Sequence, residues 1–222
     1  MPLIIGITGS IATGKTTACE IMKELGAVHC DADKLVHTLY EPGKPAFHRI
    51  ISVFGEDILD QQGYIDRKIL GGKVFGNADE MLKLTRAIGD IKVAVQNVVE
   101  HWNNTLEENA VALLEAVNLI EAEYAHWCDR TWLFASDEKT SLSRLIKRNQ
   151  LTKHEASKRL DSQRKWEDRS SVSDLVIFNN SNYNNLKATV LSEFHKLTSL
   201  SQLGKLTPSL YSKMQFEKEI TG

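Results

Sequence analysis

The sequence contains no apolar run that approaches the ~20 residues needed to span a bilayer. Its N-terminus begins in a strand-like segment and lacks the basic segment, apolar stretch and cleavage site of a secretory signal. The net charge is only −2 at pH 7, which gives no bulk attraction to nucleic acid or to an acidic membrane. These absences predict a cytoplasmic protein with no membrane or nucleic-acid partner.

Cysteine is scarce as well, because the 222 residues include only Cys19, Cys30 and Cys128. They are odd in number and form no metal-like cluster, so the sequence predicts reduced thiols that pack as small hydrophobic side chains. The hydrophobic content of 42% and the charged content of 25% are those of an ordinary globular protein. A chain of this length can bury one sizeable α/β core with an inserted subdomain.

One segment near the N-terminus matches the phosphate-binding pattern G-x-x-x-x-G-K-[ST] at every fixed position. A β-branched run over residues 3–8 precedes it and predicts a buried parallel strand, and apolar residues at helical spacing follow it. From average residue usage, chance gives such a match in roughly one in a hundred chains of this length. The predicted ATP-binding residues here are Gly9, Ser10, Ile11, Ala12, Thr13, Gly14, Lys15, Thr16 and Thr17.

The chemistry of this loop follows from its residue types. Its glycines let the backbone curl until consecutive N–H groups point at phosphate oxygens, and the following helix N-terminus adds partial positive charge. Lys15 is expected to reach the β- and γ-phosphates, and the Thr16 hydroxyl is expected to ligate Mg²⁺.

A second short strand, predicted over residues 26–30, delivers Asp31 and Asp33 at its C-terminal end. Ligands of open α/β sheets bind at that edge, where two carboxylates can orient a hydroxyl nucleophile and hold Mg²⁺ or its waters. Alternatively, Asp31 caps the next helix, predicted over residues 34–40. Asp33 is the preferred functional residue of the two.

Two prolines and a glycine predict a turn at residues 41–45, and apolar residues at three- and four-residue spacings then predict helices up to about residue 105. This segment is too long for a simple crossover between strands. It therefore indicates an inserted helical subdomain suited to an acceptor substrate. The alternative is that these helices only cover the sheet.

The third predicted strand, residues 111–114, leads to two acidic candidates near the metal or the acceptor, Glu115 and Glu121. Either carboxylate can instead cap or charge the start of the next helix.

The fourth predicted strand, residues 131–135, is followed by the most basic part of the chain. Residues 137–169 carry ten Lys or Arg against six Asp or Glu. Arginines on a mobile helical pair can close over a triphosphate and stabilise the transferring phosphoryl group. The alternative is an ordinary solvated helix face.

The fifth predicted strand, residues 175–178, leads into Asn179 and Asn180. The last long helix carries an apolar stripe that is predicted to be core and comprises Tyr183, Leu186, Val190, Phe194 and Leu197. Residues after 199 are polar and predict an irregular tail with a short helix near residues 214–219.

Together these segments resemble the dephospho-coenzyme A kinase family over about residues 3–198. The resemblance rests on G-S-I-A-T-G-K-T, D-A-D, E-P-G-K-P-A-F, S-R-L-I-K-R-N-Q-L-T, R-L-D-S-Q and D-L-V-I-F-N-N. It implies a five-stranded parallel sheet of the P-loop NTPase type, flanked by helices. The implied parts are a discontinuous nucleotide-binding core (1–33, 106–136 and 173–199), a helical acceptor-binding insertion (34–105), a helical lid (137–172) and a C-terminal tail (200–222).

The resemblance also implies transfer of the ATP γ-phosphoryl group, with Mg²⁺, to the ribose 3′-hydroxyl of dephospho-CoA. By that likeness Asp33 accepts or orients the hydroxyl proton, and Arg144 and Arg148 are the lid arginines. The implied acceptor-binding residues are Asp31, Asp33, Glu115 and Glu121; the implied metal ligands are Thr16 and Asp33; and Asn179 and Asn180 lie near the adenine.

The chain departs from the family pattern at two places. Gly89-Asp90 stands where the family usually has His-Pro, and residues 117–121 keep only part of the usual P-L-L-(apolar)-E. Both lie near where the acceptor is expected. Two other functions therefore stay open: a related P-loop kinase with another hydroxyl or nucleotide acceptor, and an ATP-binding regulatory module without turnover. The sequence leaves the oligomeric state open.

Overall fold

The computed structural model describes residues 1–221. The chain forms two compact units, one made of residues 1–31 together with residues from 98 onward, the other of residues 32–97. Each unit is described by itself. Among the residues described, no helix is long and apolar enough to cross a bilayer.

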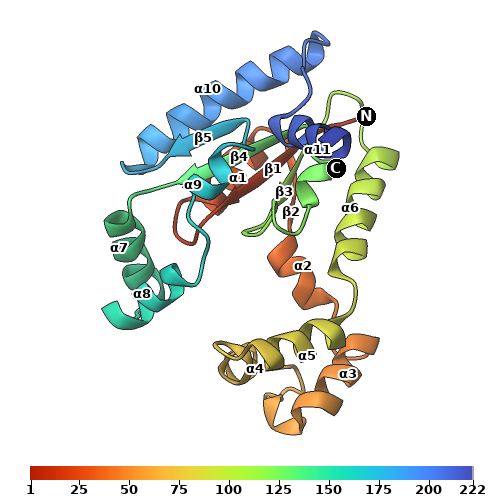
Figure 1. Cartoon of the computed structure of the whole chain (residues 1–222), viewed down its shortest axis with the longest axis vertical. Coiled ribbons are helices and arrows are strands. Elements are labelled where there is room, and N and C mark those ends of the chain that lie inside the picture. The colour runs from red at the N-terminus through yellow and green to blue at the C-terminus, as the bar shows by residue number, and fades with distance from the viewer. Residues whose placement is uncertain (222) are drawn as a thin grey trace. The chain divides into compact units, whose positions relative to one another are not determined.

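A five-stranded parallel sheet is the centre of the first unit, in the order β2-β3-β1-β4-β5 (Figure 1). Its strands are β1 (Leu3–Gly9), β2 (Val28–Asp31), β3 (Val111–Glu115), β4 (Arg130–Ala135) and β5 (Leu175–Phe178). The predicted α/β class with five parallel strands is therefore confirmed. Each strand lies within two residues of its predicted position, and Glu115 is the last residue of β3 rather than the first residue after it.

Two helices of this unit, α1 (Lys15–Glu24) and α10 (Tyr183–Gln202), contribute to the main core of the sheet. The predicted stripe of α10 is buried except at Tyr183, which is 50% exposed. That residue lies in the first turn of the helix, where the Lys187 ammonium group approaches its ring.

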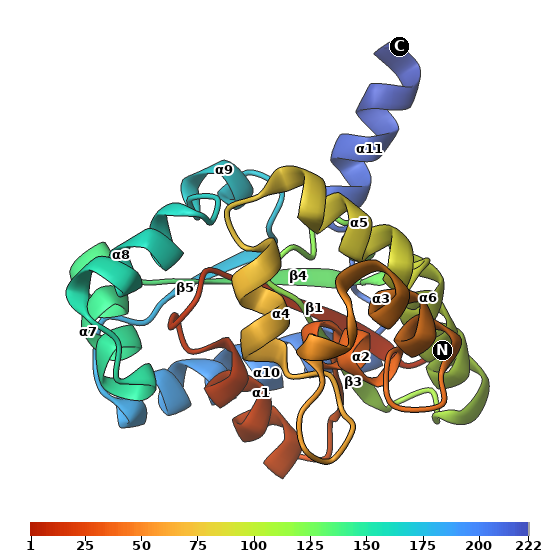
Figure 2. The ribbon, with the colours of Figure 1, turned by 90° about the horizontal axis from the view of Figure 1, so that it is seen from below.

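The basic region folds as α7 (Glu138–Asn149), α8 (Lys153–Asp161) and the short α9 (Glu167–Ser170). Figures 1 and 2 show α7 and α8 side by side. The helix α8 begins with a capping box between Thr152 and Glu155, whose side chains each bond the other's backbone N–H.

The C-terminal segment is more ordered than the sequence indicates, because it ends in an α-helix, α11 (Leu210–Thr221). Its residue Tyr211 is 2% exposed and contacts His126, which lies in the 3₁₀ helix η2 (Tyr124–Trp127). One buried aromatic side chain therefore anchors a segment whose composition is otherwise polar.

The second unit is helical and has its own hydrophobic core. Its helices are α2 (Ala32–Thr38), α3 (Pro45–Phe54), the 3₁₀ helix η1 (Glu56–Ile58), α4 (Arg67–Val74), α5 (Ala78–Ile88) and the first half of α6 (Ile91–Thr105). The helices α4 and α5 begin at side-chain caps from Asp66 and Asn77. Helix α2 starts two residues earlier than predicted and places Asp33 in its first turn.

Candidate active site

The phosphate-binding sequence forms the connection between β1 and α1, as its pattern predicts. Gly9 and Gly14 have φ values of 142° and 98°, which favour glycine. A Cβ atom at Gly9 would collide with the carbonyl oxygen of Phe134, and one at Gly14 with the side-chain amide of Asn179. The two fixed glycines are therefore required both by the turn and by close packing.

Lys15 is buried, with 8% exposure, at the start of α1. Its Nζ donates to the carbonyl oxygens of Gly9 at 2.8 Å and Ser10 at 2.9 Å. The ammonium group thus lies against the phosphate-binding loop, and its two carbonyl partners keep it hydrogen-bonded in a site with little access to water.

Three donors surround the carboxylate of Glu115 at the C-terminal end of β3. The Thr16 hydroxyl donates to its Oε1 at 2.8 Å, His29 Nε2 lies 3.0 Å from its Oε2, and the Cys19 thiol also bonds the carboxylate. Burial alone would raise the pKa of Glu115, but the hydrogen bonds from His29 and Thr16 and the Lys15 charge lower it below its usual value. Glu115 is therefore an ionised acid beside the phosphate-binding loop.

His29 and Cys19 were not among the predicted site residues. The three cysteines do not cluster with one another, but the ligand atoms of Cys19, His29 and Glu115 lie within 4.8 Å of each other. They come from α1, β2 and β3, so only the fold brings them together. Burial and the nearby Glu115 raise the pKa of the Cys19 thiol well above its usual value, which keeps it protonated.

The two acids of D-A-D belong to different units. Asp31 ends β2 in the first unit and is in register with Glu115 on the neighbouring strand. Asp33 follows two residues later, in α2 of the second unit. The structure therefore brings Asp31 and Glu115 to the same sheet edge, while the role of Asp33 stays a prediction.

Asn179 connects the basic helices to the phosphate-binding loop. The Asn179 side-chain amide donates to the Thr13 carbonyl at 3.0 Å. The Asn179 backbone carbonyl accepts from Arg144 Nη1 at 2.7 Å. Arg144 also donates to the Ser181 carbonyl, and the side-chain carbonyl of Asn180 accepts from the backbone N–H of Asp137. These four contacts hold the segment after β5 against the phosphate-binding loop on one side and against the start and the middle of α7 on the other.

The segment after α8 also contacts the phosphate-binding loop. The backbone N–H of Ile11 donates to Gln163 Oε1 at 2.7 Å, and the Ser10 hydroxyl donates to the Arg164 carbonyl at 3.2 Å. Gln163 ends the segment R-L-D-S-Q, and the sequence alone predicts no role for it. By contrast, Arg148 is exposed on α7, where its Nε donates to the side-chain carbonyl of its neighbour Asn149.

Glu121 pairs with a buried arginine rather than starting a helix. Arg169, which is 4% exposed, donates from Nε to Glu121 Oε1 at 2.7 Å. Within the described chain, Glu121 Oε2 and Arg169 Nη1 are buried and have no hydrogen-bond partner. The pair holds α9 to the segment after β3. In it the Glu121 carboxylate compensates the charge of the Arg169 guanidinium, which is buried from water.

Arg169→Met should lower the free energy of unfolding by about 3 kcal/mol, because it leaves the partly buried Glu121 carboxylate with only the exposed Arg164, whose Nε is 3.9 Å from Oε1. We place this loss at the lower end for buried pairs because the Glu121 side chain keeps 21% exposure. Urea denaturation measures it, with the exposed Lys158→Met as control. Restoration of stability in the double variant Arg169→Met/Glu121→Leu would support the pair, whereas an unchanged Arg169→Met would show that it contributes nothing.

The two departures from the expected pattern have local structural roles. Gly89 ends α5 with a φ of 98°, and the Asp90 side chain accepts from the backbone N–H of Val93 in the first turn of α6. The Val117 carbonyl accepts from the Thr8 hydroxyl at 3.0 Å. Each departure therefore fits its surroundings without a disrupted helix or strand.

The chain is similar to known dephospho-CoA kinases over most of its length. The family model described as dephospho-CoA kinase matches residues 3–185. A dephospho-CoA kinase from Streptococcus agalactiae is 33% identical over 197 residues, which cover 89% of this chain and 100% of that protein. One from Carboxydothermus hydrogenoformans is 31% identical over 198 residues, covering 87% of this chain and 93% of the relative.

Solved structures agree with the sequence relatives. A dephospho-CoA kinase from Campylobacter jejuni superposes with a TM-score of 0.59 at 26% identity and covers 87% of this chain and 96% of its own. A crystal structure from Thermus thermophilus gives a TM-score of 0.72 at 23% identity over 88% of this chain and 98% of its own, which supports the fold alone.

Proposed function

Because the chain belongs to the dephospho-CoA kinase family, we propose that it transfers the γ-phosphoryl group of ATP to the ribose 3′-hydroxyl of dephospho-CoA, giving CoA and ADP. The observation that carries this proposal is the formed phosphate-binding loop, with Lys15 against it and Thr16 bonded to an ionised Glu115. That arrangement suits a triphosphate and its metal ion.

The reaction requires in-line displacement at the γ-phosphorus. The 3′-oxygen of the acceptor forms the new P–O bond, the bond from the γ-phosphorus to the β–γ bridging oxygen breaks, and ADP leaves. Asp33 takes the proton of the attacking hydroxyl. The loop N–H groups and Lys15 hold the β- and γ-phosphates and stabilise the charge that develops on the leaving oxygen.

Mg²⁺ fits the groups that the chain offers, since the Thr16 hydroxyl and the Glu115 carboxylate place hard oxygen atoms 2.8 Å apart at the sheet edge. When bound, it neutralises charge on the β- and γ-phosphate oxygens. Thr16 and Asp33 are the proposed direct ligands. Glu115 orients the Thr16 hydroxyl, and with Asp31 it adds negative charge that favours a cation at this edge.

The helices α7 and α8 are the proposed lid, with Arg144 and Arg148 near the phosphates. Arg148→Ala should lower kcat at least about tenfold and leave the KM for dephospho-CoA within about twofold, because the guanidinium stabilises transition-state charge. Initial rates at varied acceptor concentration measure both parameters, and Lys147→Ala, the exposed neighbour on α7, is the matched control. A change in acceptor KM alone would contradict the lid assignment.

The proposed function is tested by measuring ADP release from ATP–Mg²⁺ with and without dephospho-CoA, with mass spectrometry of the product. CoA that appears in step with ADP would support the proposal and would make Gly89-Asp90 and Val117-Asn118 tolerated variation. ATP binding without CoA formation would contradict it, and a screen of other hydroxyl acceptors would follow.

A further inference from the structure

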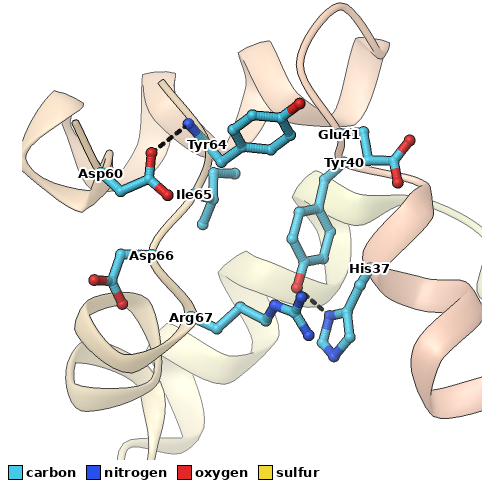
Figure 3. Close-up of a pocket in the computed structure, with 8 residues that line it drawn as sticks. All are labelled: His37, Tyr40, Glu41, Asp60, Tyr64, Ile65, Asp66 and Arg67. Atoms are coloured by element: carbon cyan, nitrogen blue, oxygen red, sulfur yellow. Dashed lines mark hydrogen bonds between the residues drawn. The ribbon is translucent and has the colours of Figure 1, made fainter. Parts of the chain in front are cut away.

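The second unit contains a pocket of about 460 Å³ that no part of the proposed mechanism uses. Figure 3 shows it between the end of α2 and the segment that leads into α4. The lining residues are His37, Tyr40, Glu41, Asp60, Tyr64, Ile65, Asp66 and Arg67.

Hydrogen-bond donors gather at one end of this pocket. Figure 3 shows the Arg67 guanidinium beside the Tyr40 hydroxyl, which bonds His37 Nδ1. Tyr40 is 7% exposed and belongs to the core of the unit, so its hydroxyl is held in place. Burial raises the pKa of Tyr40 and the Arg67 charge opposes that rise, which places the guanidinium within electrostatic reach of the hydroxyl.

The acidic side chains that line the pocket either accept hydrogen bonds from backbone N–H groups or are directed away from Arg67. Asp66 Oδ1 accepts from two backbone N–H groups at the start of α4, and Asp60 Oδ1 accepts from those of Gln62 and Tyr64. The Glu41 carboxylate is directed away from Arg67 in Figure 3. Within the described residues Arg67 makes no ion pair, so its charge is available to an anion.

The pocket is close to the proposed base along the same helix. Asp33 and His37 are four residues apart on α2, which places them on one face, about 6 Å apart along the axis. In a nucleotide, the 3′-hydroxyl and the C5′ carbon that carries the 5′-phosphate are attached to adjacent carbons of one ribose ring, on its opposite faces. An acceptor whose 3′-hydroxyl reaches Asp33 therefore carries its 5′-linked diphosphate about one helical turn away.

We propose that Arg67, Tyr40 and His37 form the subsite for the diphosphate of the acceptor nucleotide and thereby hold its ribose 3′-hydroxyl at Asp33. The inference rests on the proposed function and adds the group that is recognised and the residues that recognise it. Arg67 is the main contributor, because a guanidinium matches two phosphate oxygens at once.

The test compares Arg67→Gln with Lys68→Gln, which removes the adjacent exposed cation on α4. Arg67→Gln should raise the KM for dephospho-CoA at least about tenfold, the scale of a charge-assisted hydrogen bond, while kcat and the KM for ATP stay within about twofold. Lys68→Gln should change none of these values. Tyr40→Phe, which removes only the hydroxyl and keeps the packed ring, should raise the same KM severalfold.

A ligand-side comparison isolates the diphosphate. Adenosine offers the same 3′-hydroxyl without a phosphate, so Arg67→Gln should leave its kcat/KM unchanged while that for dephospho-CoA falls. An equal loss on both acceptors, or on neither, would overturn the subsite and leave the proposed function standing. If the native chain makes no CoA at all, the proposed function fails instead; calorimetric titration of dephospho-CoA then tests the subsite by itself, since unchanged affinity in Arg67→Gln would overturn it.

Discussion

Asp33→Asn should lower kcat by at least about a hundredfold and leave the affinity for ATP near normal. The asparagine keeps the size and the hydrogen-bonding oxygen of the side chain but cannot take the proton of the attacking hydroxyl, and general-base catalysis typically contributes this much. Steady-state CoA formation gives the rate, and calorimetric titration with a non-hydrolysable ATP analogue gives the affinity.

A matched control separates catalysis from helix electrostatics. Asp79, like Asp33, is an acid in the first turn of a helix of the second unit, and it is exposed. Asp79→Asn loses the same favourable interaction with the helix dipole and should leave kcat unchanged. A near-normal rate in Asp33→Asn would remove Asp33 from its proposed role.

Lys15→Met should lower kcat by about a hundredfold to a thousandfold, the usual effect of removing one group that stabilises developing charge. The variant keeps the length of the side chain, but it loses the ammonium group that bonds the Gly9 and Ser10 carbonyls in the loop. ATP affinity should fall as well, because this cation faces both the loop and the proposed phosphate site.

The control for Lys15 lies on the same helix. Lys23 is an exposed residue in the last turn of α1, where its Nζ pairs with Glu20 Oε1 at 3.1 Å. Lys23→Met should therefore leave rate and ATP affinity unchanged. If Lys15→Met turned over as fast as the native chain, the assignment of this loop to the γ-phosphoryl group would be wrong.

The sequence predicts those features that depend on local pattern. Apolar runs located all five strands, and the two fixed glycines located the loop because no other residue type fits their backbone and neighbours. The edge that holds Asp31 and Glu115 was also foreseeable, because parallel strands present their carboxyl ends together.

Contacts between distant residues could not be predicted in this way. His29 and Cys19 both bond Glu115, and Arg169 pairs with Glu121. The two residues of each contact are 48 to 96 positions apart in the chain. A single sequence shows a charged residue but not its partner, so it predicts Glu121 near the acceptor and Arg169 in the lid. The burial of Tyr211 could not be predicted either, because a single aromatic residue in a polar segment has no hydrophobic periodicity.

The cysteines have a consequence for a protein proposed to handle dephospho-CoA. Burial raises the pKa of all three thiols, that of Cys30 to about 11 and those of Cys19 and Cys128 well above the usual value. Thiol–disulfide exchange requires a thiolate, and these groups are almost entirely protonated at neutral pH. The proposed acceptor and product each end in a free thiol that oxidises to a disulfide. The chain can therefore bind either one repeatedly without becoming trapped as a mixed disulfide with its own ligand.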